Sequence, residues 1–224
     1  FMMDPNNEAT NNRFALPIRA TGIKTLPNGE LSVYVTPSAQ LKSKNQVTLV
    51  EPADQPKGIA VGLYQTVNGA LGGNWLLGVK HDKTGDVKNT RVIAQYGGSL
   101  TPSTALDVVA EYRINTAPND GGNKWLAIGA RTDTHLGGPF RLLFEAGHDQ
   151  VKPDAGDTRN MTKFTVAAAA SAGKEPGSRP TVRLFLTHAI WNDAARLALS
   201  GRTQEVFGDK KAGTSLGIQA ETWW

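Results

Sequence analysis

Apolar and polar residues alternate along many short segments of this chain, most plainly at its C-terminal end. From 216 to 224, Leu, Ile, Ala, Thr and Trp224 take the even positions, whereas Gly, Gln, Glu and Trp223 take the odd ones. Strict alternation predicts a β-strand with one apolar face and one polar face. We expect strands near 15–24, 30–40, 58–67, 74–82, 90–97, 105–114, 124–132, 139–148, 161–171, 180–191 and 213–224. Only residues 192–200 are compatible with a short helix, in a loop.

The links between the expected strands alternate in length. Short, turn-rich links are expected at 26–29, 68–73, 98–104, 133–138 and 172–179, and longer polar links at 42–57, 83–89, 115–123, 149–160 and 192–212. Outer-membrane barrels have short turns at the periplasmic edge and longer loops outside the cell. We therefore expect an all-β protein, an antiparallel transmembrane β-barrel of the porin type, rather than a soluble sandwich. Residues 15–224 are assigned to barrel strands and loops, and residues 1–14 to an N-terminal polar segment or loop.

The number of expected strands is odd, whereas bacterial single-chain barrels have an even number. At least one strand is therefore expected upstream of Phe1, or the count is wrong by one. The first residues also lack the basic and apolar regions of a signal peptide. The chain is interpreted as processed or as part of a longer protein.

Composition argues against several other functions. The chain has no cysteine, so disulfides, thiolate metal sites and cysteine nucleophiles are excluded. The net charge is +4, and no run of Lys and Arg resembles a nucleic-acid-binding arm. The four histidines are isolated from one another, and the Gly-Gly pairs lack the Lys-Ser/Thr of a phosphate loop. We expect no enzyme activity, no metal, no cofactor and no nucleic-acid partner.

The position of charge assigns the two faces of the expected sheet. A charged side chain at the lipid midplane costs about 2–4 kcal/mol, so the charged face must line the lumen. In 105–114 that face carries Asp107, Val109, Glu111 and Arg113. The same rule places Arg91, Gln95, Arg131, Arg141, Glu145, Lys163 and Arg183 inside, and Leu31, Val33, Leu106, Val108, Leu184, Leu186, Ile218 and Trp224 outside. Trp75, Tyr96 and Tyr112 fall on the lipid side, whereas Trp125 and Trp191 are left unassigned.

Pairs of aromatic and charged residues on the lumen face suit sugar binding. An aromatic ring covers the apolar face of a sugar, while charged side chains bind its hydroxyl groups. Trp223 with Glu221, and Phe185 with Arg183, have this pairing, and Glu111, Arg113 and Arg131 complete the candidate sugar track. A second interpretation stays open, in which these charges form salt bridges that stiffen the barrel wall.

Several segments resemble the maltoporin family of trimeric sugar porins. They are 159–168, 171–174, the Gly-Ser-Arg-Pro-Thr-Val-Arg-Leu-Phe run at 177–185, the terminal Gln-Ala-Glu-Thr-Trp-Trp, and 123–131. The resemblance implies about 11 strands of an 18-stranded barrel, a homotrimer in the outer membrane of a Gram-negative bacterium, and an aromatic slide for glucose rings. Trp223 stands at one slide position. Gly177 stands where the family has another slide aromatic.

The resulting hypothesis is a channel for facilitated diffusion of maltodextrin-like oligosaccharides, with a lipid bilayer as surroundings and a leak of small ions. The lumen charges favour a weak preference for anions. The alternative is a structural or receptor barrel with a closed lumen, whose loops 42–57 and 192–212 bind partners.

Overall fold

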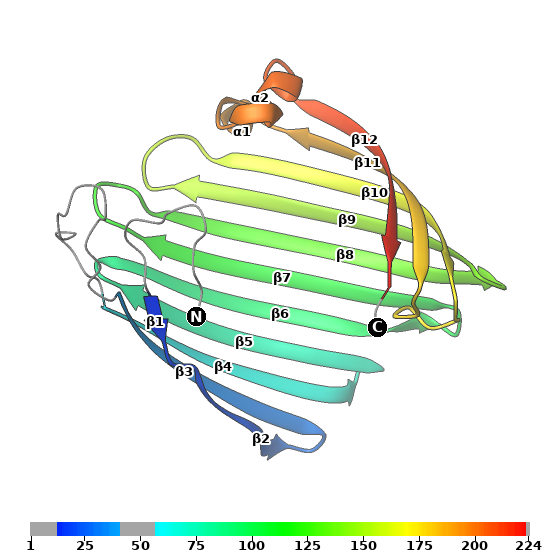
Figure 1. Ribbon diagram of the computed structural model, residues 1–224, viewed down its shortest axis with the longest axis horizontal. Coiled ribbons are helices and arrows are strands. Elements are labelled where there is room, and N and C mark those ends of the chain that lie inside the picture. Colours follow the sequence, from blue (N-terminus) through cyan, green and yellow to red (C-terminus); the bar gives the residue numbers. More distant parts are fainter. Residues whose placement is uncertain (1–12, 41–56, 223–224) are drawn as a thin grey trace.

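The computed structural model describes residues 13–40 and 57–222, which form one broad, curved antiparallel sheet (Figure 1). From residue 29 onward each strand pairs with its neighbours along the chain, and within the described residues the outermost strands do not pair with each other. The strands are β1 (Arg13–Ala15), β2 (Ile18–Leu26), β3 (Gly29–Gln40), β4 (Lys57–Ala70), β5 (Gly73–Thr84), β6 (Val87–Thr101), β7 (Thr104–Thr116), β8 (Asn123–Gly137), β9 (Phe140–Pro153), β10 (Arg159–Ser171), β11 (Thr181–Trp191) and β12 (Ala212–Glu221).

The first two strands occupy a single position in the sheet. Ala15 of β1 lies opposite Ser38, and Ile18 of β2 lies opposite Val35 of the same strand β3. Pro17 stands between them and has no N–H to donate, which interrupts the ladder. The eleven predicted strand positions are therefore confirmed, the first being split by a proline.

The register confirms the predicted assignment of faces. Residues directly opposite each other share a face, and Asp107, Arg131 and Glu145 lie opposite one another on β7, β8 and β9. We call this side the charged face and the other side the apolar face. The described residues predicted to point outward all lie on the apolar face: Leu31, Val33, Leu106, Val108, Leu184, Leu186 and Ile218. Trp224 lies outside the described residues.

No second layer covers the apolar face within the part of the chain that the structure describes. Leu184 is 50% exposed and Ile218 is 77% exposed, whereas the buried hydrophobic residues are the small Ala167 and Ala169 of the opposite face. A soluble sandwich would bury these leucine and isoleucine side chains against another sheet. The apolar face is thus available to lipid.

The predicted strict alternation of link lengths is wrong in two places. Residues 83–89 do not form a long loop, because β5 and β6 extend to a tight turn at Gly85 and Asp86, where Gly85 has φ +58°. Residues 172–180 link β10 to β11 and are longer than the turns 27–28, 71–72, 102–103 and 138–139 at the same edge. We call that edge the short-turn edge. The links 117–122, 154–158 and 192–211 meet at the opposite, long-loop edge.

Two short helices, α1 (Asp193–Leu197) and α2 (Gly201–Phe207), lie in the link between β11 and β12 (Figure 1). The helix expected at 192–200 is confirmed as α1, and the Asn192 side chain caps it by accepting the Ala195 N–H at 3.0 Å. The hydrogen bond from Lys211 Nζ to Asp193 at 2.6 Å lowers the pKa of that carboxyl. The sequence did not predict α2. Neither helix is long and apolar enough to cross a membrane, nor is any other helix among the described residues.

Candidate lumen site

The charged face is hollowed in two places. A hollow of about 820 Å³ extends over β4 to β10, and a groove of about 210 Å³ lies over β8 to β12. The polar lining of the hollow includes Thr66, Asn74, Gln95, Asp107, Glu111, Arg131, Glu145, Asp149 and Lys163. The groove is lined by Arg131, Glu145, Lys163, Arg183, Phe185 and Gln219, among others.

Glu111 holds together two arginines on the charged face. Its Oε1 accepts from Arg113 Nη2 at 2.6 Å and lies 3.1 Å from Arg91 Nε. Arg91 and Arg113 stand directly opposite each other, so the carboxylate offsets the repulsion between two like charges. The side chains of Glu111 and Arg113 are 19% and 18% exposed, which leaves part of each within reach of a solute.

Trp125 joins this cluster from β8. The Arg113 guanidinium lies 4.4 Å from the centroid of the Trp125 ring, and Trp125 Nε1 donates to Asp149 Oδ1 at 2.8 Å. The sequence analysis left this tryptophan unassigned. Trp125 and Arg131 both have odd numbers in one strand, and that parity would have placed it on the charged face.

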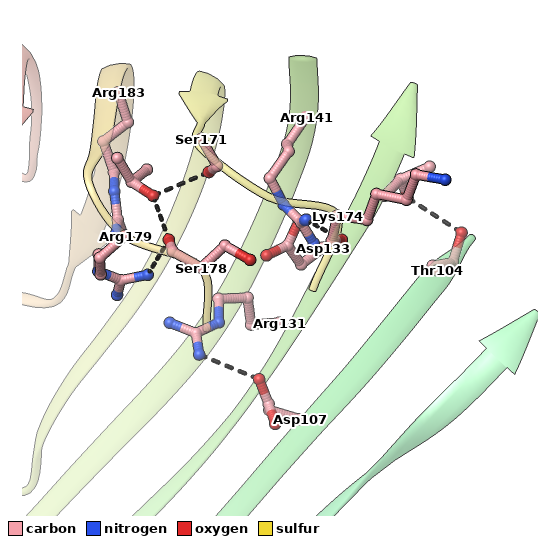
Figure 2. Close-up of polar contacts among 12 residues, drawn as sticks. Thr104, Asp107, Arg131, Asp133, Arg141, Ser171, Lys174, Ser178, Arg179 and Arg183 are labelled. Atoms are coloured by element: carbon pink, nitrogen blue, oxygen red, sulfur yellow. Dashed lines mark hydrogen bonds and ion pairs between the residues drawn. The ribbon is translucent and has the colours of Figure 1, made fainter. Parts of the chain in front are cut away.

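Arg131 forms a more open pair. Its Nη2 lies 3.0 Å from Asp107 Oδ2 on the neighbouring strand, and the two side chains are 45% and 52% exposed (Figure 2). An exposed ion pair contributes little to stability, about 0–1 kcal/mol. Both groups therefore remain available for hydrogen bonds to a solute at little cost.

A third cluster lies near the short-turn edge, where Glu221 of β12 receives two arginines. Arg183 Nη2 donates to Glu221 Oε2 at 2.6 Å, and Arg179 Nη2 forms an ion pair with the same oxygen. Glu221 and Arg183, which the sequence placed in two separate aromatic–charged pairs of the sugar track, are thus in direct contact.

The link 172–180 folds across the charged face beside this cluster (Figure 2). The Arg141 side chain, 3% exposed, pairs with Asp133 at 2.8 Å and donates to the Lys174 carbonyl. The Thr181 hydroxyl donates to the Ser178 carbonyl at 2.6 Å and lies 2.8 Å from the Ser171 hydroxyl. The sequence predicted Arg141 inside the lumen but not its role in fixing this link.

Phe185 lies on the charged face, over glycine. A Cβ added at Gly217, directly opposite on β12, would lie 2.5 Å from Phe185 Cζ, so only glycine leaves room for this ring. The ring lines the smaller groove together with Arg131 and Arg183. The structure therefore brings three of the predicted site residues to one groove.

A tyrosine pair that the sequence analysis did not consider also stands on the charged face. The rings of Tyr34 and Tyr64 meet edge to face, with centroids 5.4 Å apart, and the Tyr64 ring covers Gly78. Residues 58–67 contain no charged residue, so charge could not show which face of that strand is inside. Tyr34 could have been found, because its neighbour Val33 was predicted to point outward.

Among the other aromatic residues, Trp75, Tyr96 and Tyr112 lie on the face that the sequence predicts, whereas Trp191 had been left unassigned. Trp75 and Tyr96 face each other across β5 and β6 on the apolar face, with ring centroids 4.9 Å apart. Tyr112 also lies on that face, and Trp191 lies on the charged face against Phe207. Trp223 lies outside the described residues.

Comparison with known families agrees with the geometry. The family described as LamB porin matches residues 3–224, which include every strand of the sheet. Its members are transmembrane β-barrels that act as sugar channels, not as enzymes, in the outer membrane of Gram-negative bacteria. An uncovered apolar face, a charged face with aromatic rings and an antiparallel neighbour-to-neighbour sheet are what such a barrel requires. The chain belongs to the LamB porin family.

Proposed function

We propose that this porin passes maltodextrin-like oligosaccharides by facilitated diffusion along its charged face. The observation that carries the proposal is the groove in which the Phe185 ring lies beside Arg131 and Arg183. An aromatic ring and guanidinium groups in one groove match the apolar face and the hydroxyl rim of a glucose unit.

The proposed sugar-binding residues are Trp223, Glu221, Arg183, Phe185, Glu111, Arg113 and Arg131. The ion pairs of Glu111 and Glu221 support both this role and a role in stiffening the wall. Each carboxylate meets its two guanidinium groups through one oxygen, Glu111 Oε1 and Glu221 Oε2, and the other oxygen retains lone pairs for sugar hydroxyls. Both roles are therefore compatible in one residue.

Binding in such a lumen is expected to be weak. One stacked ring and a few hydrogen bonds contribute on the order of 1–3 kcal/mol, and a permeating solute must leave as readily as it enters. One such contact alone corresponds to a dissociation constant on the order of 10–100 mM, and an oligosaccharide that makes two of them reaches the millimolar range or somewhat tighter. We further propose a homotrimer and a leak of small ions with a weak preference for anions, which rest on the family and on the lumen charges.

Replacing Phe185 by alanine is expected to reduce the blockage of ion current by oligosaccharides while leaving the bare conductance equal or slightly higher. The reason is that the groove loses its stacking surface and gains volume. The measurement is current through the native assembly in a planar bilayer, with and without a maltodextrin series. Leu184→Ala is the matched control, because Leu184 lies next along β11 on the apolar face. If oligosaccharides never block the wild-type current, the receptor alternative is supported instead.

A further inference from the structure

The apolar face carries charge at one edge only. From β3 to β12, its lysines are Lys57, Lys83, Lys88, Lys124 and Lys152, and these strands place no Asp or Glu on that face. All five lysines are exposed and lie near strand ends at the long-loop edge. That edge faces outside the cell in an outer-membrane barrel.

Four of these lysines form two opposed pairs. Lys83 lies directly opposite Lys88 across β5 and β6, and Lys124 lies directly opposite Lys152 across β8 and β9. Like charges directly opposite each other destabilise a sheet. Within the described part of the chain, none of the four forms an ion pair.

On the charged face, an opposed pair of like charges is neutralised by the protein itself. There Arg91 and Arg113 are also directly opposite, and the chain supplies the Glu111 carboxylate between them. The two lysine pairs have no such internal anion. The contrast indicates that their counter-charge comes from outside the protein.

The depth of the lysines fits the headgroup region of a bilayer. Further along the strands from the long-loop edge, three cross-strand pairs on this face join a histidine to a threonine: His81–Thr90, His148–Thr162 and His188–Thr214, each with Nδ1 and Oγ1 2.8 Å apart. On the β5–β6 hairpin an apolar pair follows, Val79 opposite Val92. The face thus grades from apolar through hydrogen-bonded polar residues to cations, and lysine stems span such a gradient with the ammonium group in the polar layer.

We propose that the pairs Lys83–Lys88 and Lys124–Lys152 each bind a phosphate group of a phosphorylated glycolipid in the outer leaflet. A phosphomonoester carries more than one negative charge and several acceptor oxygens, so one group serves two ammonium ions. Lys57 stands one step further out on β4 and adds to the first site. The acyl chains of the same lipid would lie on the apolar rows below.

The test titrates the native assembly, in a neutral detergent, with lipid A. Lipid A is a glucosamine disaccharide that carries acyl chains and phosphates. Native mass spectrometry counts the lipid molecules bound. The variant K83Q/K88Q/K124Q/K152Q is expected to bind lipid A about tenfold or more weakly. K163Q, on the charged face, is the matched control and should bind as the wild type does. Without lipid A this quadruple variant should be as thermally stable as the wild type or more so, because the repulsion between opposed lysines is removed.

Three results would overturn the proposal. Equal binding of lipid A by the wild type and the quadruple variant would show that the four lysines are solvated and do not contact the lipid. Equal binding of dephosphorylated lipid A would assign the contact to acyl chains alone. If inorganic phosphate displaced bound lipid A at the same concentration as added lipid A does, the site would be one for soluble phosphate rather than for a lipid.

Discussion

Replacing Arg141 by alanine is expected to lower the free energy of unfolding by about 3–5 kcal/mol, since it breaks a buried ion pair from one side. Asp133, 9% exposed, would keep a charge that no longer has its guanidinium 2.8 Å away. The Lys174 carbonyl would also lose its donor, which frees the link 172–180. Urea titration of the protein in lipid vesicles measures the first effect, and the rate of tryptic cleavage after Lys174 measures the second.

The double substitution Asp133→Leu with Arg141→Leu separates charge from packing. Removing both partners of a buried pair is often nearly neutral, so this variant should recover most of the stability that Arg141→Ala loses. It should still cleave faster than the wild type after Lys174, because no donor reaches that carbonyl. Equal stability of Arg141→Ala and the wild type would contradict the role of the pair in stability, and equal rates of cleavage after Lys174 would show that the link 172–180 does not depend on Arg141.

Replacing Leu186 by arginine is expected to lower the free energy of unfolding by about 2–4 kcal/mol, the cost of a cation at the lipid midplane. Leu186 is 45% exposed and stands at the centre of β11, with Val166 and Leu216 directly opposite. Urea titration in vesicles and the yield of folded assembly on a heat-shift gel measure the effect.

Thr187→Arg is the matched control, one residue further along β11 on the charged face. It removes the hydrogen bond with Thr165 at 2.8 Å, which is worth about 1 kcal/mol, but places its charge among other lumen charges. The expected order of stability is wild type, Thr187→Arg, then Leu186→Arg. If the two arginines cost the same, the assignment of faces on β11 is wrong.

The sequence by itself determined which residues share a face, because a strand has a side-chain period of two. One charged residue per strand was enough to orient that strand, as Arg183 did for β11 and Glu111 for β7. The same logic failed for Tyr64, whose predicted strand had no charge. The sequence also failed to predict the tight turn at Gly85, because polar residues at the strand ends in 83–89 resemble a loop.

Only the tertiary structure decided which residues meet across strands. Arg113 lies over Trp125, Arg183 reaches Glu221, and Phe185 covers Gly217 because of the register between strands, which no local pattern encodes. The link 172–180 folds inward because Arg141, from another hairpin, donates to the Lys174 carbonyl. The register between strands also places the lysine pairs opposite each other. Alternation within a strand is a local property of the backbone, whereas register depends on hydrogen bonds between segments distant in the chain.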